Sequence, residues 1–220
     1  MFLEVPELLT PEEVAQLREI AKATPFVSGR ISNPHNQTKN NQQIDQTKPG
    51  YRDSAEIMMR ALGRCEEMHD FVMPNVIPPP MLCRYGPGQS YGRHSDAAYQ
   101  HVNGRRIRFD ISCTIFISEP EACEGGELTI HFGARTLKIK GKAGSAVFYP
   151  SVTLHEVAPI KSGERLVAIT FIESQVRDPA KRELLYLLNE VHALEGNRME
   201  WENRVLLQHV QASLMRMWAE

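Results

Sequence analysis

The sequence predicts a mainly β domain, a sandwich or barrel, flanked by helices. Between about residues 81 and 174, short alternating or apolar runs are separated by Gly, Pro and charged turns, a texture typical of regularly spaced strands. Helical periodicity stands on both sides of this region. The length of 220 residues suits one domain of moderate size with its own hydrophobic core.

Six segments carry the strand pattern. They are MLCRYG (81–86), RFDISCTIFIS (108–118), GELTIH (126–131), RTLKIK (135–140), SAVFY (145–149) and RLVAITFIE (165–173).

Two helical patterns precede the strands. Thr10 is placed as an N-cap, with Pro11 at the first helical position and Glu13 completing a capping box. Residues 53–72 predict a second helix that packs on the sheet. Its apolar stripe consists of Met58, Ala61, Leu62, Cys65, Met68 and Val72.

Helical texture returns after the strands. Asp178 and Pro179 mark a start and Gly196 a stop, around a stripe of Leu184, Leu187, Leu188 and Val191. A final helix is predicted from about Met199 to Trp218. We therefore divide the chain into a domain of residues 1–177 and a C-terminal helical extension of residues 178–220. We expect the stripes to pack on the same chain, with a homodimer contact as the alternative.

Asn and Gln dominate the segment between Gly29 and Tyr51. Such a composition offers few anchors for a core and favours a mobile surface insertion. A lid over an active site, formed by residues 31–51, is the alternative.

Composition limits the classes of partner. With 25 basic and 27 acidic side chains, the net charge of −2 leaves no footprint for nucleic acid or an anionic membrane surface. Cys65, Cys83, Cys113 and Cys123 form no CxxC pair, and the N-terminus lacks the pattern of a secretion signal. We expect reduced thiols and a cytoplasmic protein without a membrane span.

His94, Asp96 and His155 form an incomplete metal-ligand set. Side chains two apart on an extended segment point the same way, so His94 and Asp96 can reach one ion while Ser95 faces elsewhere. A barrel would bring His155 to them. Two imidazoles and one carboxylate hold one face of iron(II) and leave the opposite face open for a co-substrate and dioxygen.

Arg165 follows His155 by ten positions, in a predicted strand antiparallel to the one near His155. Its guanidinium could receive the far carboxylate of a keto acid that chelates the iron. Together with the three metal ligands, Arg165 points to an oxygenase.

These motifs resemble a known family. CRYGPGQSYGRHSD, EGGEL at residues 124–128, GSAVFYPSVTLHEV and SGERLVAITF follow one another in the order found in iron(II)- and 2-oxoglutarate-dependent dioxygenases. The chain is most similar to the bacterial PKHD-type hydroxylases, which are related to prolyl 4-hydroxylases.

The resemblance implies a double-stranded β-helix (jelly-roll) core, with His94, Asp96 and His155 as Fe(2+) ligands and Arg165 as the 2-oxoglutarate anchor. It also implies hydroxylation of an amino-acid side chain, a peptide or a small metabolite, with dioxygen consumed and succinate and CO2 released. L-ascorbate is expected as a further cofactor that re-reduces the iron.

One position departs from the family pattern. Prolyl-hydroxylase relatives often place a co-substrate-binding tyrosine where this chain has Phe116, and a phenylalanine cannot donate that hydrogen bond. Tyr85 or Thr170 could supply it instead; the alternative is that both are ordinary strand residues. Arg108 and Tyr91 are candidate substrate contacts, although the basic run around Arg108 also suits a solvated turn.

Three other functions stay open at this point. Oxidative demethylation of nucleic acid is disfavoured by the charge balance, and by Phe171 at the position where that branch carries a second arginine. A cupin-like protein would bind metal or a small ligand without keto-acid chemistry. A ligand-triggered interaction protein is the remaining option.

Overall fold

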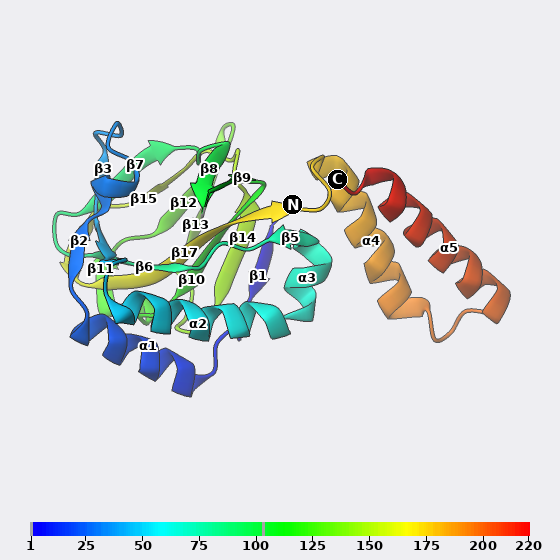
Figure 1. Cartoon of the computed structure of the whole chain (residues 1–220), viewed down its shortest axis with the longest axis horizontal. Helices are drawn as coiled ribbons and strands as arrows, with labels where there is room; N and C mark the ends of the chain where they lie inside the picture. The colour runs from blue at the N-terminus through cyan, green and yellow to red at the C-terminus, as the bar shows by residue number, and fades with distance from the viewer. Residues whose placement is uncertain (1, 103) are drawn as a thin grey trace.

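Two antiparallel sheets face each other in the computed structural model, which describes residues 2–102 and 104–220 (Figure 1). The larger sheet has eight strands, with β5 attached to β17 beside the main path. In spatial order its strands are β1 (Leu3–Val5), β14 (Ala146–Pro150), β10 (Ile111–Phe116), β17 (Arg165–Ser174), β6 (Met81–Tyr85), β4 (Gln42–Ile44) and β2 (Phe26–Ser28), with β5 at Pro74–Val76.

The opposing sheet has five strands. Its order is β13 (Arg135–Ile139), β12 (Leu128–Phe132), β15 (His155–Val157), β7 (Ser90–His94) and β3 (Lys39–Asn40). Two small ribbons complete the β structure: β8 (Tyr99–Val102) with β9 (Arg105–Arg108), and β11 (Cys123–Gly125) with β16 (Ile160–Gly163). All six predicted strands are present, so the prediction of a mainly β barrel is confirmed.

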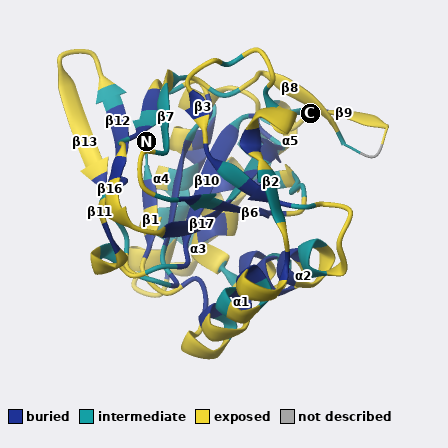
Figure 2. Ribbon diagram, turned by 90° about the vertical axis from the view of Figure 1, so that its left-hand side faces the viewer, coloured by how far each residue is buried: buried dark blue, intermediate teal, exposed yellow. Residues whose placement is uncertain are grey.

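The core lies on both sides of the larger sheet. All six residues of β10 are buried, because one face of this strand meets the opposing sheet and the other meets the N-terminal helices. Figure 2 shows the same contrast, with buried central strands and an exposed outer surface on α1 (Pro11–Ala23) and β13. A near-continuous apolar run is expected of a strand that is covered on both faces.

The N-terminal helices cover the outer face of the larger sheet, as predicted (Figure 1). Thr10 caps α1 with the predicted capping box, in which Thr10 and Glu13 exchange side-chain to backbone hydrogen bonds. The second prediction needs correction: α2 (Pro49–Arg64) begins before residue 53, and Cys65 in extended conformation separates it from α3 (Glu66–Val72). The apolar stripe continues across this break, because Met68 and Val72 are fully buried.

The segment of residues 31–51 is not an unanchored insertion. After the 3-10 helix η1 (Gly29–Ser32), the chain forms β3, which pairs with β7, and then β4, which pairs with β2 and β6. It therefore crosses from one sheet to the other and closes that side of the barrel. Lys39, Asn41 and Gln43 are buried in this crossing, where composition alone predicted exposure. A second 3-10 turn, η2, spans Pro120–Ala122.

Two C-terminal helices, α4 (Pro179–Glu195) and α5 (Trp201–Trp218), form a hairpin that extends away from the barrel (Figure 1). Asp178 caps α4 as predicted. Burial of the apolar stripe against the same chain was wrong, because Leu184, Leu187 and Val191 are exposed and α5 contains no buried residue. No helix in the described part of the chain is long and apolar enough to span a membrane.

The base of the hairpin is tied to the barrel. Met73, Val176 and Leu185 form a small buried cluster against which Trp218 packs. Backbone bridging of Val176 with Ala219 brings the end of α5 back to the start of α4. The hairpin is therefore fixed at one end only.

Candidate metal centre and co-substrate site

His94, Asp96 and His155 converge where the five-stranded sheet meets the start of β10. His94 closes β7 and His155 opens β15, and their Cα atoms are register partners in the antiparallel ladder. The backbone N–H of Asp96 donates to the Ser151 carbonyl over 3.1 Å, which fixes the chain just after β7. Pairing of these two strands thus brings together side chains that lie about sixty positions apart.

The donor atoms of the three residues face a common point. His94 Nε2 lies 3.8 Å from Asp96 Oδ1, and His155 Nε2 lies 3.7 Å from Asp96 Oδ2. One ligand atom from each residue falls within 4.8 Å of the other two, so the group could hold a metal ion. The imidazole rings tilt by 52° with centroids 4.3 Å apart, so they approach that point from different directions.

Backbone carbonyls orient both imidazoles. His94 Nδ1 lies 2.8 Å from the Gly92 carbonyl oxygen and His155 Nδ1 lies 2.9 Å from that of Thr153. A carbonyl can only accept, so each Nδ1 carries a proton, and in the neutral tautomer with this proton the lone pair is on Nε2. Backbone partners of this kind set the tautomer and orientation of metal-binding histidines in many proteins.

A serine pair supports the carboxylate. The Ser112 hydroxyl donates to Asp96 Oδ2 over 2.5 Å and lies 2.8 Å from Ser151 Oγ. Because Ser112 has one hydroxyl hydrogen, Ser151 is the donor in the second hydrogen bond. Sequence reasoning missed this support, since Ser112 sits inside an apolar strand and no spacing rule links it to Asp96.

Burial sets the charge state of the site. Desolvation, with repulsion from His155 second, lowers the pKa of His94 to about 4, so its ring is neutral at pH 7. Desolvation raises the pKa of Asp96, and the proximity of His155 and the Ser112 hydrogen bond oppose that rise. A neutral imidazole is the form that binds metal, and a bound cation would favour the ionised carboxylate.

Arg165 lies on the other side of the barrel, at the start of β17 in the larger sheet. We expected its strand to run antiparallel to the one near His155; the two strands are not paired, because β17 pairs with β10, β6 and β5, whereas β15 belongs to the opposing sheet. The side chain is buried at 4% exposure. Its titratable neighbours in the described part of the chain are Tyr and Cys side chains, Tyr85 among them. None of these neighbours is a carboxyl group.

Tyr85 and Phe116 flank the guanidinium. Arg165 Cζ lies 5.2 Å from the centroid of the Tyr85 ring and 5.8 Å from that of the Phe116 ring. Tyr85 is also the register partner of Arg165 across the β6–β17 ladder. Burial raises the pKa of Tyr85, so its hydroxyl stays protonated and can donate a hydrogen bond. A tyrosine therefore lies beside Arg165 even though Phe116 occupies the position expected for one.

Thr170 does not join this group. It is five residues from Arg165 on one strand, so strand alternation turns it to the opposite face of the sheet. Its hydroxyl donates to the Pro78 carbonyl over 2.7 Å and is buried there. The structure therefore does not place the Thr170 hydroxyl beside Arg165.

The two candidate substrate contacts lie in different places. The Tyr91 ring stacks on His94 with centroids 3.6 Å apart, and its hydroxyl accepts a hydrogen bond from Asn33. Arg108 instead binds both oxygens of Asp110 and reaches Glu220 at the end of the chain. Arg108 therefore anchors the C-terminal residue, and the prediction that it contacts substrate is not supported.

Known proteins are similar in sequence to this chain along its whole length. The family model of the 2OG-Fe(II) oxygenase superfamily matches residues 80–173. A PKHD-type hydroxylase of Sphingopyxis alaskensis is 46% identical over 99% of both chains, and one of Methylobacillus flagellatus is 37% identical over 100% of both. The chain belongs to the PKHD-type hydroxylase family. The resemblance found in the motifs is thereby confirmed.

Solved structures place this PKHD-type hydroxylase in the double-stranded β-helix fold. A prolyl-4-hydroxylase of Pseudomonas putida superimposes with a TM-score of 0.57 at 18% identity, covering 78% of this chain and 92% of that one. A viral collagen prolyl hydroxylase of Paramecium Bursaria Chlorella virus-1, in complex with 2OG, gives a TM-score of 0.54 at 20% identity, over 79% and 96% of the two chains. The fold class predicted from sequence is confirmed.

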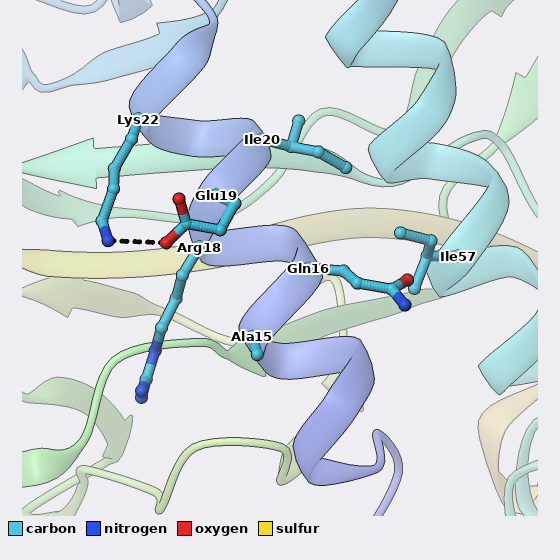
Figure 3. A pocket seen from close by; sticks show the side chains of 7 residues that line it. All are labelled: Ala15, Gln16, Arg18, Glu19, Ile20, Lys22 and Ile57. Atoms are coloured by element: carbon cyan, nitrogen blue, oxygen red, sulfur yellow. Dashed lines mark hydrogen bonds and ion pairs between the residues drawn. The ribbon is translucent and has the colours of Figure 1, made fainter.

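A surface hollow beside α1 plays no part in this centre. Figure 3 shows Arg18, Glu19 and Lys22 directed outward from α1, with Glu19 and Lys22 paired, while Ile20 and Gln16 approach α2. The lining residues are Ala15, Gln16, Arg18, Glu19, Ile20, Lys22 and Ile57, and none belongs to the metal or co-substrate site. The hollow is a gap between two amphipathic helices of this PKHD-type hydroxylase.

Proposed function

We propose that this PKHD-type hydroxylase uses Fe(2+), 2-oxoglutarate and dioxygen to hydroxylate an amino-acid side chain, a peptide or a small metabolite. Succinate and CO2 would be the co-products. The observation that carries the proposal is a His-Asp-His group at the ends of two paired strands of one sheet, combined with a buried arginine in the other sheet that has no carboxyl partner in the described part of the chain.

The donor set fits iron. One face is supplied by His94, Asp96 and His155, which leaves adjacent positions for a chelating keto acid and for dioxygen. Bound iron(II) would supply the oxidative decarboxylation of the keto acid and the hydroxylation of the substrate C–H bond.

The protein's own groups would bind and orient the co-substrate. Arg165 would receive the far carboxylate of 2-oxoglutarate, and the Tyr85 hydroxyl would donate a second hydrogen bond to it. Both side chains are buried, so these interactions act in a medium that screens charge less than water does. Their role is placement and exclusion of water rather than proton transfer.

Nucleic-acid demethylation finds no support in this geometry. Phe171, six positions after Arg165 and on the same face of β17, stacks on Phe109 with ring centroids 4.3 Å apart. An aromatic pair therefore occupies the place of a second cationic residue.

We propose L-ascorbate as the reductant that restores iron(II) after uncoupled turnover. The four cysteines are free thiols, which supports our proposal of a reducing, cytoplasmic location.

The decisive test is succinate formation without added substrate. Wild-type protein with Fe(2+), 2-oxoglutarate and ascorbate should release succinate slowly, and Arg165→Ala should abolish that release while metal affinity is unchanged. Arg182→Ala is a matched control, because Arg182 is equally buried at 4% but lies at the base of α4. A wild-type protein that binds metal and never forms succinate would instead be a cupin-like binder.

The exposed hairpin supports a second proposal, that residues 178–220 mediate a homodimer. Its exposed large apolar side chains are Leu184, Leu187, Val191, Leu194, Trp201, Val205, Leu206, Val210 and Met217. Several exposed large apolar side chains on one element are typical of an interface. Light scattering after size exclusion should show a dimer that Leu206→Glu converts to a monomer, whereas Leu137→Glu on β13 should have no effect. A monomeric wild-type protein would reject this proposal.

A further inference from the structure

Lys39 is a buried cation next to the metal centre. It sits on β3, at the edge of the five-stranded sheet, and its register partner is Tyr91 on β7. Lys39 Nζ lies 5.4 Å from the centroid of the Tyr91 ring, whose other neighbour is the ring of His94. Only 6% of Lys39 is exposed. The charge of Lys39 therefore acts on His94 and Asp96 through little water.

The ammonium group has no carboxylate partner in the part of the chain that the structure describes. Its one hydrogen bond there goes to Ser32 Oγ over 2.6 Å. Asp96 is the nearby carboxyl group that acts on its charge, but the two form no salt bridge. Lysine is almost never fully buried unless it is paired, and two of the three ammonium hydrogens remain to be used. An anion that is not part of the chain would complete the site.

Polar side chains connect Lys39 with Arg165 along the crossing from β3 to β4. Lys39 and Asn41 are two residues apart on extended chain, so they point the same way. Asn41 lies near the Tyr85 hydroxyl, and Tyr85 flanks Arg165. The buried oxygens Asn41 Oδ1 and Gln43 Oε1 have no partner among the described residues. Such unsatisfied groups indicate a strip that a ligand or water completes.

Resting on the proposed function, we propose that Lys39 binds the carboxylate adjoining the keto group of 2-oxoglutarate. The two ends of the dicarboxylic acid would then meet two buried cations on opposite sheets, Lys39 at the metal end and Arg165 at the far end. A segment that composition marked as a surface loop would thus supply part of the co-substrate site.

Electrostatics favours an interaction of Lys39 with the carboxylate next to the keto group. An unpaired ammonium beside a divalent metal would be repelled by it, since few water molecules screen the two charges. A carboxylate that binds the metal with one oxygen and accepts a hydrogen bond from Lys39 with the other removes that repulsion. The far carboxylate, which Arg165 would receive, cannot do so because it lies away from the metal.

Isothermal titration of Mn(2+)-loaded protein tests the assignment without turnover. The probes are 2-oxoglutarate and 2-oxobutyrate, which keeps the keto acid but lacks the far carboxylate. Lys39→Met should weaken both acids by roughly tenfold to a hundredfold, as expected for loss of a charge-assisted hydrogen bond. Arg165→Met should weaken 2-oxoglutarate alone. Lys140→Met is the matched control, because Lys140 follows β13 and donates to the Cys123 carbonyl.

Two results would overturn the assignment. Unchanged affinity for both acids in Lys39→Met would mean that Lys39 binds neither, and weaker binding of 2-oxoglutarate alone would place Lys39 at the far end. Ser32→Ala separates the charge of Lys39 from the local structure, because it removes the hydrogen bond of the ammonium group and keeps its charge. If Ser32→Ala weakened keto-acid binding as much as Lys39→Met does, the proposal would also be rejected. If Lys39→Met loses Mn(2+) or melts early, Lys39→Gln replaces it. Wild-type protein that binds neither acid would refute the proposed function itself.

Discussion

The two helical pairs of this protein have similar sequence patterns and different surroundings. In the first pair, α1 buries Val14, Leu17 and Ala21, and α2 buries six residues against the larger sheet. In the C-terminal pair, α4 buries only Arg182 and Leu185, and α5 buries none. An apolar stripe therefore predicts a helix but does not identify the surface that will cover it. The first pair stabilises the barrel that holds the metal centre, and the second is available for contacts outside it.

The largest effect is expected from a substitution in the metal centre of the barrel. Asp96→Ala removes the carboxylate that lies between the two imidazoles and should abolish measurable Mn(2+) binding in a titration. Leu206→Glu in α5 should leave that binding unchanged, because the hairpin contributes none of the three ligands. Metal loss in the hairpin variant would break the proposed separation of roles.

Truncating matched apolar residues sharpens the same contrast in stability. Met58 on α2 is fully buried, whereas Leu206 on α5 is 63% exposed. Met58→Ala should lower the free energy of unfolding by about 2–5 kcal/mol, and Leu206→Ala should change it by less than about 0.5 kcal/mol. Urea denaturation at low protein concentration measures both. Equal losses would show that the hairpin is covered in solution.

Within the barrel, the support of Asp96 should matter less than Asp96 itself. Ser112→Ala removes the 2.5 Å hydrogen bond to the carboxylate and should weaken Mn(2+) binding by about 10- to 100-fold, as is typical of partners that orient metal ligands. Ser118→Ala is the control, because Ser118 is half-buried just beyond the far end of β10 and its hydroxyl donates to the Leu166 carbonyl, away from the ligands. Unchanged affinity in Ser112→Ala would mean that backbone contacts alone fix Asp96.

The smallest effect concerns the first helical pair. Arg64 on α2 pairs with Glu13 and, as the largest cause, lowers the pKa of Glu13 below its usual 4.5. Glu13→Gln should cost about 0.5–1 kcal/mol at pH 7. A lowered carboxyl pKa stabilises the fold above the unfolded value, so the difference should disappear as pH falls through the folded-state pKa. Glu12→Gln in the same helical turn should cost nothing; equal costs would exclude the pairing as the cause.

Sequence reasoning succeeded where a local rule fixes the outcome. Thr10 and Asp178 cap their helices because a short polar side chain next to proline satisfies the first free N–H groups. The His94 and Asp96 spacing works because strand alternation turns both side chains the same way. The same parity rule argues against Thr170, which is an odd number of residues from Arg165, so that error could have been avoided.

The rest depended on pairing that no local pattern encodes. Lys39 and Asn41 lie in a stretch rich in Asn and Gln, and they become buried because β3 pairs with β7 at the edge of one sheet and β4 inserts between β2 and β6 in the other. Ser112 meets Asp96 across a distance in sequence that only the barrel closes. The ion pair of Arg108 with Glu220 could not be predicted, because Glu220 lies at the far end of the chain.

The most direct test of the account is the visible spectrum of the iron(II) protein on anaerobic addition of 2-oxoglutarate. A keto acid that chelates iron(II) gives a charge-transfer band, so the account predicts a band that saturates at one equivalent per chain. Arg165→Ala should need more co-substrate to reach it, and His155→Ala should not show it. An iron-loaded wild-type protein that gives no such band would contradict the claim that three side chains leave two adjacent positions open.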